Sequence, residues 1–470
     1  MKIEITNKYL IEIGKIADEN KIEAFAVGGF VRDKLLGKEV TDIDIVVVGD
    51  GIDFAKIVMK HFGKQTLVKY EKFGTAMLEL GETKIEFVGA RKESYSKDSR
   101  KPFVDVGTLS DDLSRRDFTI NALAASINKN NFAEVLDPFD GKSDLSKKII
   151  RTPLNPEITF DDDPLRMLRA VRFASQLNCE IDSATISAIV KMKNRITIVS
   201  QERITNEFLK ILASAKPSIG LKLLFETGLM KIIFPEVEEL SGVDQRQEFY
   251  HKDVFLHTCI VVDNISERTE NIYLRLAALL HDIAKPRTKQ FKEDIGWTFY
   301  GHEEIGARML KNIFRKLKLP LTNLAYVEKL VRLHLRPMVL VSGGVTDSAV
   351  RRVLFEAGET IDDLMTLCRA DITSKNPNLV EQYMNNYEIV YAKMKEVESK
   401  DKLRAFEPPV RGDEIIKILN LPPSKIIGLL KTAIEDAILD GTIPNEHDAA
   451  LEYLLKIKDE ILAKNENLLK

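Results

Sequence analysis

The stretch AFAVGGFVRDKLLGKEVTDIDIVVVG at positions 24–49 decides the fold of the first third of the chain. Residues 24–27 are apolar and predict a short buried strand that ends at a pair of glycines. Residues 30–37 have helical spacing and end in a glycine, which is typical of a helix C-terminus. Residues 42–49 predict the clearest strand of the chain, and it is also bounded by glycines. The order strand, glycine pair, helix and strand predicts an α/β unit.

The same reading extends outward from this stretch. A helix is expected at 53–62, and strands are expected at 75–80 and 84–90, with a tight turn between them. The polar segment 91–102 predicts a mobile loop. From about Pro164 onward, helical spacing dominates and strand signals nearly vanish. The sequence therefore predicts an α+β protein, in which an N-terminal α/β head with a mixed sheet is followed by all-α domains.

Further helices are expected within the second part of the chain, at 165–174, 183–193, 200–214, 217–229 and 271–284. Breaks between helical segments are expected near Pro235, near Pro337 to Gly344, and at Pro408-Pro409.

Length, charge and composition limit the class of protein. The 470 residues exceed one typical domain, and a net charge of −3 with 44% hydrophobic residues fits a soluble globular protein. No apolar run approaches the roughly 18–20 residues of a membrane helix, and the acid-containing first segment is unlike a signal peptide. Cys179, Cys259 and Cys368 lie far apart and cannot build a disulfide framework, so we expect a cytoplasmic protein without a membrane partner. The near-neutral charge neither requires nor excludes a nucleic-acid partner.

Two aspartates on the strand at 42–49 form the first candidate catalytic group. Asp42 and Asp44 are two residues apart, so both side chains leave the same face of the strand. Mg²⁺ binds through one or two carboxylates plus substrate phosphates, and the nearby Gly28-Gly29 and Arg32 are suited to contact those phosphates. These parts suit two-metal nucleotidyl transfer. Each motif alone also fits a simple turn or a solvated strand, and it is their order along the chain that favours function.

Six motifs then follow in a recognisable order. They are VGGFVRDKLLG, TDIDIVVVG, RRDFTINALA (115–124), DPFDG (137–141), DDPLRMLRAVRFA (162–174) and ERITNEFLKIL (202–212). This ordered set resembles the class II tRNA nucleotidyltransferase/poly(A) polymerase family across about the first 215 residues. The resemblance implies a nucleotidyltransferase head at 1–150, and a helical neck and body at 151–244 that selects nucleotides and binds RNA.

The resemblance also implies roles for individual residues. Asp42 and Asp44 match the catalytic, Mg²⁺-binding carboxylates. The positions that match nucleotide-binding residues are Gly28, Gly29, Arg32, Arg116, Asp163, Arg166, Arg169 and Arg172. Among these, Asp163 and Arg166 match the pair that reads the base edge of CTP or ATP in place of a template. The family usually has Glu-Asp before Pro-Leu-Arg, whereas this chain has Asp162-Asp163, which leaves the base-reading aspartate in place.

The residues of this last block also have a structural interpretation. Asp163 precedes Pro164, a pair typical of a helix N-terminus. The arginines recur every three residues, so they spiral around the helix without acidic partners beside them. Glu86, on the strand at 84–90, is a weak candidate for a third carboxylate near the metals. Basic residues that fit either an RNA backbone or a solvated helix surface are Lys147, Lys148, Arg151, Lys191, Lys193, Arg195, Arg203 and Lys210.

A second candidate site is formed by histidines and aspartates between 257 and 371. Buried imidazoles and carboxylates are costly unless a metal or partner ion satisfies them, and this donor set suits Mn, Fe, Ni or Zn. The order H…HD…H…H…D resembles the HD phosphohydrolase superfamily over about residues 245–375. The resemblance implies that the metal ligands are His257, His281, Asp282 and Asp371, with His302 and His334 as the extra histidines of two-metal members. A vestigial domain kept for packing or dimerisation is the alternative.

The function expected from these resemblances is the addition of C, C and A to tRNA 3′ ends from CTP and ATP, with a possible phosphohydrolase activity. The helical tail at 376–470 is expected to approach the tRNA elbow, with Ser424 and Lys425 as phosphate contacts. The alternatives are poly(A) polymerase, an enzyme that adds only CC or only A, and an HD phosphohydrolase whose head merely binds nucleotides. A loop at 91–102 that looks complete slightly favours addition of the final A. The oligomeric state and the HD substrate stay open.

Overall fold

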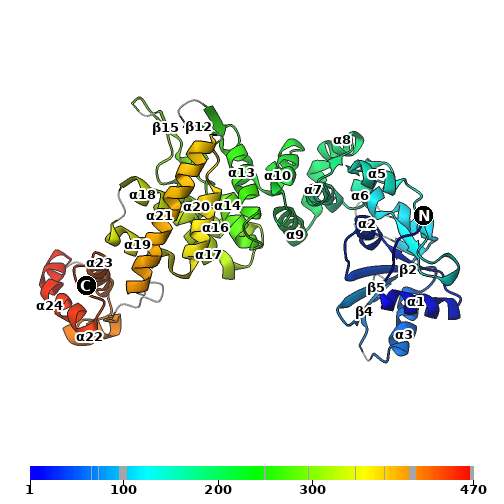
Figure 1. The fold of residues 1–470 in the computed structure, drawn as a ribbon, viewed down its shortest axis with the longest axis horizontal. Coiled ribbons are helices and arrows are strands. Elements are labelled where there is room, and N and C mark those ends of the chain that lie inside the picture. Colours follow the sequence, from blue (N-terminus) through cyan, green and yellow to red (C-terminus); the bar gives the residue numbers. More distant parts are fainter. Residues whose placement is uncertain are drawn as a thin grey trace. The chain divides into compact units, whose positions relative to one another are not determined.

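The computed structural model describes residues 1–64, 66–71, 74–94, 103–247, 250–294, 296–343, 346–374, 376–401 and 409–465. The chain forms two compact units, Met1–Glu238 and Glu239–Lys470, which are described separately below (Figure 1). No helix among the described residues combines the length and the apolar character needed to cross a membrane.

The first unit is built on a seven-stranded sheet with the order β3-β4-β5-β2-β1-β8-β9. Its strands are β1 (Ala24–Val27), β2 (Asp42–Val47), β3 (Val68–Tyr70), β4 (Thr75–Leu80), β5 (Thr83–Gly89), β8 (Ala124–Ser126) and β9 (Val135–Leu136). Strand β2 runs parallel to β5, whereas the other neighbouring pairs are antiparallel. The sheet is therefore mixed, which confirms the predicted α+β class with its mixed head sheet.

Apolar residues cover both faces of the central strands. On one face, Ile43 and Ile45 pack into the large core that α1 (Lys8–Glu19) and α3 (Gly51–His61) help to close. On the other face, Val46 packs against a smaller cluster that includes Leu113 of α4 (Leu109–Ser114). Because strand side chains alternate, this second face also carries Asp42 and Asp44. Helix α2 (Gly29–Leu35) follows the glycine pair, as predicted.

The first four residues of the expected loop at 91–102 form a strand. Arg91–Ser94 forms strand β6, which pairs with β7 (Phe103–Val106). The backbone at the start of the polar segment is satisfied by this two-stranded pairing, so the prediction of a loop there was wrong. Residues 95–102 lie outside the described part of the chain.

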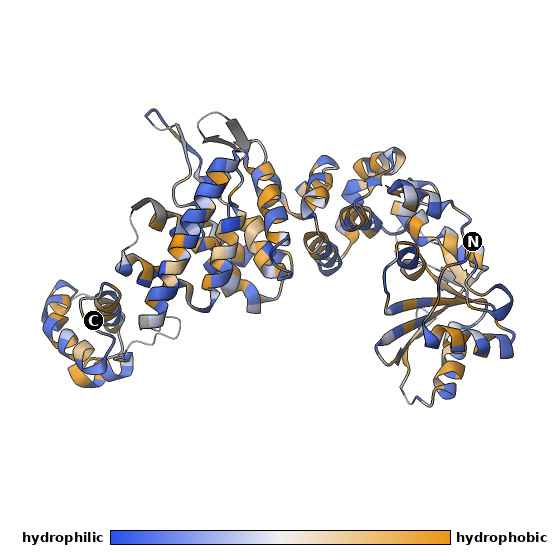
Figure 2. Cartoon of the chain, viewed as in Figure 1, coloured by the Kyte–Doolittle hydropathy of each residue, from blue (hydrophilic) through white to orange (hydrophobic). Residues whose placement is uncertain are grey.

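Helices make up most of the rest of the first unit. They are α5 (Gly141–Lys147), α6 (Pro156–Asp162), α7 (Leu165–Leu177), α8 (Ser183–Met192), α9 (Gln201–Leu212), α10 (Pro217–Glu226), α11 (Met230–Ile233) and α12 (Pro235–Glu238). Short strands β10 (Ile149–Ile150) and β11 (Glu180–Ile181) pair in parallel among them. The longer helices carry both hydrophobic and hydrophilic residues (Figure 2), as expected for helices that bury one side.

The second unit is also mainly helical. Its helices are α13 (Val254–Ser266), α14 (Ile272–Leu280), α15 (Lys285–Thr288), α16 (His302–Lys316), α17 (Leu324–Leu333), α18 (Arg336–Gly343), α19 (Asp347–Ala357), α20 (Ile361–Ala370), α21 (Pro377–Asp401), α22 (Gly412–Leu419), α23 (Lys425–Leu439) and α24 (His447–Lys464). One antiparallel pair, β12 (Asp244–Gln247) and β13 (Tyr250–Asp253), precedes these helices, and another, β14 (Gln290–Lys292) and β15 (Gly296–Thr298), lies between α15 and α16. The last three helices share a hydrophobic cluster of their own.

Candidate functional site

The two predicted catalytic aspartates lie side by side on the second face of the sheet. In β2, Asp42 and Asp44 are exposed while Ile43 and Ile45 are buried, which is the alternation expected from the sequence. Strand β5 places Glu86 directly beside Asp44 in register, so three carboxylates share this face. Asp44 opens into a cavity, yet burial by the cavity walls raises its pKa, and Asp42 adds to the effect while Arg116 opposes it. Burial, followed by the charge of Asp44, also raises the pKa of Glu86.

That cavity of about 760 Å³ brings together every residue predicted for the head site. Its lining includes Gly28, Gly29, Arg32, Asp42, Asp44, Arg116, Asp163, Arg166, Arg169 and Arg172. Carboxylates from the sheet and guanidinium groups from the helices therefore face the same space. This volume fits a drug-sized or nucleotide-sized ligand.

Gly28 has a local structural reason to be glycine. Its backbone φ is +68°, a conformation that residues with a side chain rarely adopt. A Cβ at this position would also come within 2.7 Å of Nη1 of Arg116. The glycine thus lets Arg116 lie directly against the turn that precedes α2.

The arginines of the head are held by acidic and amide partners. Arg32 donates through Nε and Nη2 to both carboxylate oxygens of Asp33, at 2.8 and 2.7 Å, and through Nη1 to Asn121 Oδ1 at 2.7 Å. Arg116 donates to Asp112 Oδ2 from Nε and Nη2, and Arg115 contacts the other oxygen. Asp112 is fully buried, which alone would raise its pKa, but Arg116 and Arg115 outweigh burial and lower it. The charged form of Asp112 therefore fixes both arginines.

The arginines of α7 have partners from other elements. Arg166 Nη2 donates to the backbone carbonyl of Arg115 at 2.8 Å. Arg169 Nε donates to Asp117 Oδ2 at 2.7 Å. Arg172 Nε lies 3.2 Å from Oε2 of Glu207 on α9. The three side chains are thus held by contacts that bridge α7 to the head and to α9.

One phenyl ring lies under three of these cations. The guanidinium carbons of Arg32, Arg169 and Arg172 lie 5.1, 5.5 and 4.3 Å from the centroid of the Phe173 ring. The ring faces of aromatic side chains attract cations, so Phe173 helps to keep three like charges close together. Such clustered, partly paired cations are suited to neutralise a polyphosphate.

Asp163 has both an acceptor role at a helix start and an ion pair. Its Oδ1 accepts from the backbone N–H of Leu165 at 3.1 Å, but the N-cap position of α7 is occupied by Pro164, so the prediction of Asp163 as the N-cap residue was one residue early. Its Oδ2 lies 2.9 Å from Nη2 of Arg203 on α9. The carboxylate therefore lies at the cavity wall, with one oxygen bound to the partly exposed guanidinium of Arg203.

Several residues of this site were missed by the sequence reasoning. They are Arg115, Asp112, Asp117, Asn121, Phe173, Glu207 and, as a cavity residue, Arg203. The i, i+4 spacing of Asp117 and Asn121 inside the RRDFTINALA block was the available signal, because their side chains bond to each other at 3.0 Å. Among the proposed RNA-binding cations, five have acidic partners: Arg151, Lys191, Arg195, Arg203 and Lys210.

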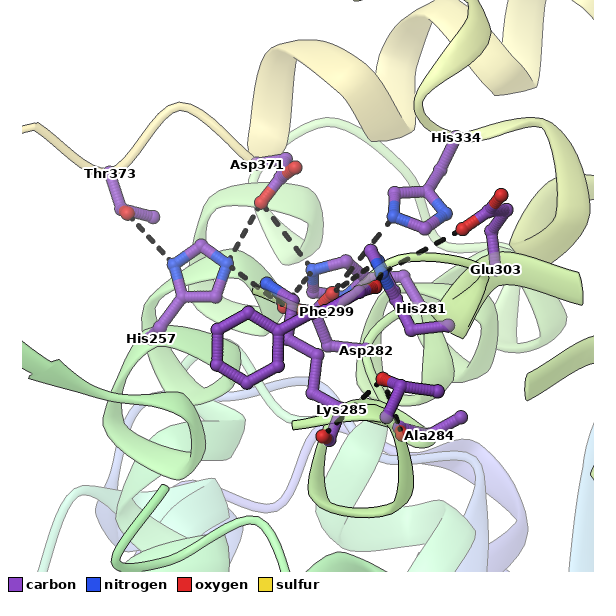
Figure 3. Close-up of polar contacts among 12 residues, drawn as sticks. His257, His281, Asp282, Ala284, Lys285, Phe299, Glu303, His334, Asp371 and Thr373 are labelled. Atoms are coloured by element: carbon purple, nitrogen blue, oxygen red, sulfur yellow. Dashed lines mark hydrogen bonds and ion pairs between the residues drawn. The ribbon is translucent and has the colours of Figure 1, made fainter. Parts of the chain in front are cut away.

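The second candidate site brings all six predicted HD residues together. They form two groups with ligand atoms within 4.8 Å of one another, namely His257, His281 and Asp371, and Asp282, His302 and His334. Figure 3 labels His257, His281, Asp282, His334 and Asp371. Asp282 lies between the groups, since its Oδ2 is 3.2 Å from His281 Nε2 and its Oδ1 is 3.3 Å from His302 Nε2. These residues are contributed by the ends of helices, where the backbone geometry lets side chains converge.

The hydrogen bonds at the back of the imidazoles define which nitrogen faces the centre. His281, His302 and His334 each place Nδ1 2.7 Å from the backbone carbonyl three residues earlier, at Ala278, Phe299 and Val331. A carbonyl only accepts, so Nδ1 must carry the hydrogen in each ring. In the neutral form of each ring, Nε2 is then a lone-pair donor directed at the centre, which is the arrangement of a metal-binding histidine.

The buried carboxylates and imidazoles of the centre are suited to hold a cation. Nε2 of all three of these rings is buried without a hydrogen-bond partner among the described residues, and Oδ2 of the buried Asp282 faces Lys285 Nζ at 2.7 Å. Burial opposes a charge on His281, but Asp282 and Asp371 raise its pKa to about 10. Burial and the charge of His281 lower the pKa of His334 to about 3. A divalent metal supplies the positive charge that a proton on His281 otherwise supplies, so the residues fit such an ion.

Two further side chains contact this centre and were not predicted. Lys285 Nζ lies 2.7 Å from Asp282 Oδ2, and Thr373 Oγ1 lies 2.9 Å from His257 Nδ1 (Figure 3).

At the tail, the N-cap position of α23 is occupied by Ser424, whose side chain makes no capping bond. The predicted elbow contact of Ser424 and Lys425 thus has no further geometric support.

Three family models match the chain. The poly A polymerase head domain matches residues 24–151, the probable RNA and SrmB-binding site of polymerase A matches 178–240, and the HD domain matches 254–376. These segments contain, respectively, the carboxylate face, helices α8 to α12 and the histidine centre.

Curated relatives resemble most of the chain. An A-adding tRNA nucleotidyltransferase of Deinococcus radiodurans is 28% identical over 91% of this chain and 94% of its own length. A multifunctional CCA protein of Haemophilus influenzae is 32% identical over 66% of this chain and 74% of its own length. An A-adding tRNA nucleotidyltransferase of Aquifex aeolicus is 35% identical over 58% of this chain, which spans 33% of that longer relative.

A solved structure resembles the fold. A tRNA nucleotidyltransferase complexed with a primer tRNA and an incoming ATP analogue is 25% identical, with a TM-score of 0.59, over 82% of this chain and 99% of the other.

Proposed function

Since this chain belongs to the tRNA nucleotidyltransferase/poly(A) polymerase family and is a nucleotidyltransferase, we propose that it adds C, C and A to tRNA 3′ ends from CTP and ATP. The observation that carries the proposal is the convergence of the sheet carboxylates and the arginines of α2 and α7 on one cavity. Residues 1–150 then act as the catalytic head, and residues 151–244 as the neck and body that select the nucleotide.

The carboxylates and the arginines of the cavity have different roles in one nucleotidyl transfer. The 3′ hydroxyl of the RNA attacks the α-phosphate, so that a new O–P bond forms, the bond to the β-phosphate bridge breaks and pyrophosphate leaves. Asp42 and Asp44, with Glu86 beside them, offer hard oxygen ligands on one face and would hold Mg²⁺. When bound, Mg²⁺ would lower the pKa of the hydroxyl and stabilise the leaving phosphates. The arginines held by Asp112, Asp117 and Glu207 neutralise the triphosphate.

Selection of the base is assigned to Asp163 and Arg166. A carboxylate accepts from an exocyclic amine, whereas a guanidinium donates to a carbonyl or ring nitrogen. Cytosine and adenine both offer an amine next to an acceptor nitrogen, while uracil and guanine offer the reverse pattern. A fixed acceptor beside a fixed donor therefore favours CTP and ATP over UTP and GTP.

Incorporation into tRNA tests this proposal. Purified protein is mixed with Mg²⁺, a tRNA that lacks its CCA end, and each nucleoside triphosphate separately or in mixture. Growth by three nucleotides with CTP and ATP together is the expected result. A long adenosine tail would instead identify a poly(A) polymerase, and no incorporation would contradict the proposal.

Addition of the final A alone is the second candidate function. It is favoured by the Deinococcus relative, which is named as A-adding and aligns with nearly its whole length. The same assay with a tRNA that already ends in CC separates the cases. An A-adding enzyme extends only this tRNA, whereas a full CCA enzyme extends both.

The HD segment, residues 245–375, would supply a second, phosphohydrolase activity. Its three imidazole Nε2 atoms and the buried Asp282 fit Mn, Fe, Ni or Zn. In this reaction a water oxygen attacks phosphorus and the ester oxygen leaves. Release of p-nitrophenol from bis(p-nitrophenyl) phosphate in the presence of Mn²⁺ tests it. If Asp42→Ala abolished nucleotide incorporation but left this hydrolysis intact, the two activities would belong to separate sites. If the chain were an HD phosphohydrolase alone, neither the parent protein nor Asp42→Ala would incorporate nucleotides.

The tail, residues 376–470, is proposed to contact the tRNA elbow. Its helices α22 to α24 have their own hydrophobic core, so it can act as a separate binding element.

A further inference from the structure

Exposed aromatic side chains gather on the β14–β15 hairpin and on the turn that follows it. Phe291, Trp297 and Tyr300 are 54%, 38% and 67% exposed. Phe291 pairs with Trp297 across the hairpin, and their ring centroids are 5.2 Å apart in an edge-to-face arrangement. The opposite face of β15 is buried at Gly296 and Thr298, so the two rings form the solvent-facing side of the hairpin.

Lysines accompany these rings. Lys289 Nζ lies 4.4 Å from the centroid of Trp297, and Lys292 Nζ lies 4.8 Å from the centroid of Tyr300. The acids of the segment, Glu293 and Asp294, lie in the connection between the two strands. A surface that alternates lysines with exposed aromatic rings has the composition of a platform for single-stranded nucleic acid.

The base of the hairpin is attached to the HD centre. The hairpin lies in the chain between Asp282 and His302, and the Phe299 carbonyl accepts from Nδ1 of His302 at 2.7 Å. The Phe299 ring lies 5.6 Å from Nζ of Lys285, which in turn contacts Asp282 (Figure 3). A nucleic-acid strand bound to the hairpin would therefore lie on the segment between Asp282 and His302, which are two of the six residues of the HD centre.

We propose that the β14–β15 hairpin and Tyr300 bind single-stranded RNA by base stacking and present it to the HD centre. Two aromatic positions, each with its own lysine, suit two bases and their phosphates. An exposed contact between an ammonium and a ring is weaker than a base stacked on indole, so the lysines can leave the rings and pair with phosphate. A protein partner would instead have to bury both lysines at the centre of its interface. The inference rests on the proposed function only for the choice of RNA.

Tryptophan fluorescence of the protein comes from this surface alone, because Trp297 is the one tryptophan of the chain. A base stacked on indole quenches its emission, so titration of the full-length protein with hexa-adenylate RNA should give saturable quenching. Emission that stays constant would overturn the inference. AMP occupies a single stacking position and should bind at least about tenfold more weakly than the hexamer. Equal affinity of AMP and the hexamer would overturn binding of a strand.

Variants that keep Trp297 sharpen the test. Phe291→Ala and Tyr300→Ala should each weaken the quenching titration about tenfold. Tyr383→Ala is the matched control, because Tyr383 is 46% exposed but lies on α21. Lys289→Gln and Lys292→Gln should each lower the slope of log affinity against log salt by about 0.7, whereas Lys311→Gln on α16 should not. If Phe291→Ala and Tyr300→Ala bound like Tyr383→Ala, the hairpin would not be the stacking surface.

The same preparations are also assayed for incorporation into tRNA. If the protein incorporates nucleotides into tRNA but the emission of Trp297 is not quenched by RNA, the result contradicts this inference and leaves the proposed nucleotidyl transfer unaffected. Quenching with an inactive head would support this inference and count against the proposed nucleotidyl transfer alone.

Discussion

Arg169 and Asp117 are 52 residues apart in the sequence, yet Nε of the arginine lies 2.7 Å from Oδ2 of the aspartate. Asp117 belongs to the block that follows α4, whereas Arg169 is in the middle of α7. The same carboxylate also accepts from Asn121, which in turn holds Arg32. One buried acid therefore connects the cationic wall on α7 with the cationic wall on α2.

Replacing Asp117 by asparagine should lower both stability and activity. The side chain is buried, and its loss leaves Arg169, which is 34% exposed, without its partner. A fully buried broken pair costs about 3–5 kcal/mol, so we expect about 2 kcal/mol here, measured by urea unfolding at pH 7. Asp161→Asn is the control, because its pair with Arg195 is largely solvated and should contribute less than about 1 kcal/mol.

The stability contributed by Asp117 should also depend on pH in a defined direction. Burial alone would raise the pKa of Asp117, but Arg169 and Asn121 outweigh it and lower the pKa. A group with a lowered folded pKa stabilises the protein above its unfolded pKa of about 4, and this stability is lost as the pH falls further. The difference between the parent and Asp117→Asn should be constant from pH 7 to about pH 4 and shrink below that. A difference that grows on acidification would contradict this.

Replacing Asp44 by asparagine should abolish incorporation without unfolding the head. Residues that merely support a metal site cost about 10–100-fold when changed, so loss of a direct ligand should reduce incorporation by more than about a hundredfold. Glu86→Gln should cost less if it is a supporting carboxylate. Glu79→Gln is the matched control, since this exposed glutamate lies on neighbouring β4 and outside the cavity lining. Activity of Asp44→Asn equal to that of Glu79→Gln would remove the carboxylate pair from the mechanism.

The head fold could be predicted because its signals are local. The alternation at 42–47 and the glycines around α2 depend on neighbours only a few residues away. Strand order was not predictable in the same way. Strand β1 pairs with β8, about a hundred residues later, and such long-range pairing has no periodicity of its own.

The site residues that could not be predicted from the sequence were missed for a similar reason. The arginines and histidines were found because motifs surround them, whereas Asp112 is one of 72 acidic residues and lies outside the quoted motifs, so only tertiary burial distinguishes it. The carbonyls of Ala278, Phe299 and Val331, which fix the imidazole tautomers, belong to the backbone and have no sequence signature. Each bond joins an imidazole Nδ1 to the carbonyl three residues earlier, and this geometry depends on where the helices begin and end.

Replacing Asp163 should change which nucleotides are accepted more than how fast the best one is used. Asp163→Asn exchanges one acceptor oxygen for a donor group, so the exocyclic amine of CTP or ATP meets a mixed partner. A site built to bond a polar group discriminates by about 10⁴–10⁵, and we expect the preference over UTP and GTP to fall by at least about a hundredfold. Single-nucleotide incorporation with all four triphosphates measures it.

Arg203→Gln gives a second measurement of the same role. It removes the ion pair at Oδ2 but leaves the Asp163 carboxylate in place, so selectivity should persist while the KM for the triphosphate changes. Arg195→Gln, on a neighbouring surface pair, should change neither. Unaltered selectivity in Asp163→Asn would remove Asp163 from base reading.

Replacing His281 by alanine should remove metal from the second unit and leave the head active. Nε2 of His281 faces Asp282 and Asp371 at 3.2 and 3.4 Å, so its loss leaves two carboxylates with less positive charge between them. Metal per chain, measured by inductively coupled plasma mass spectrometry after purification with Mn²⁺, should fall at least about tenfold.

The stability of the same variant separates a metal ligand from a packing residue. Because a metal that binds the folded state stabilises it, a chelator should lower the thermal unfolding midpoint of the parent but not that of His281→Ala. His447→Ala is the control, since this histidine is exposed on α24 and paired with Glu414. If the chelator lowered the midpoint of His281→Ala as much as that of His447→Ala, His281 would serve packing alone. Incorporation into tRNA should be equal in all three proteins, because the carboxylates of the head belong to a different unit.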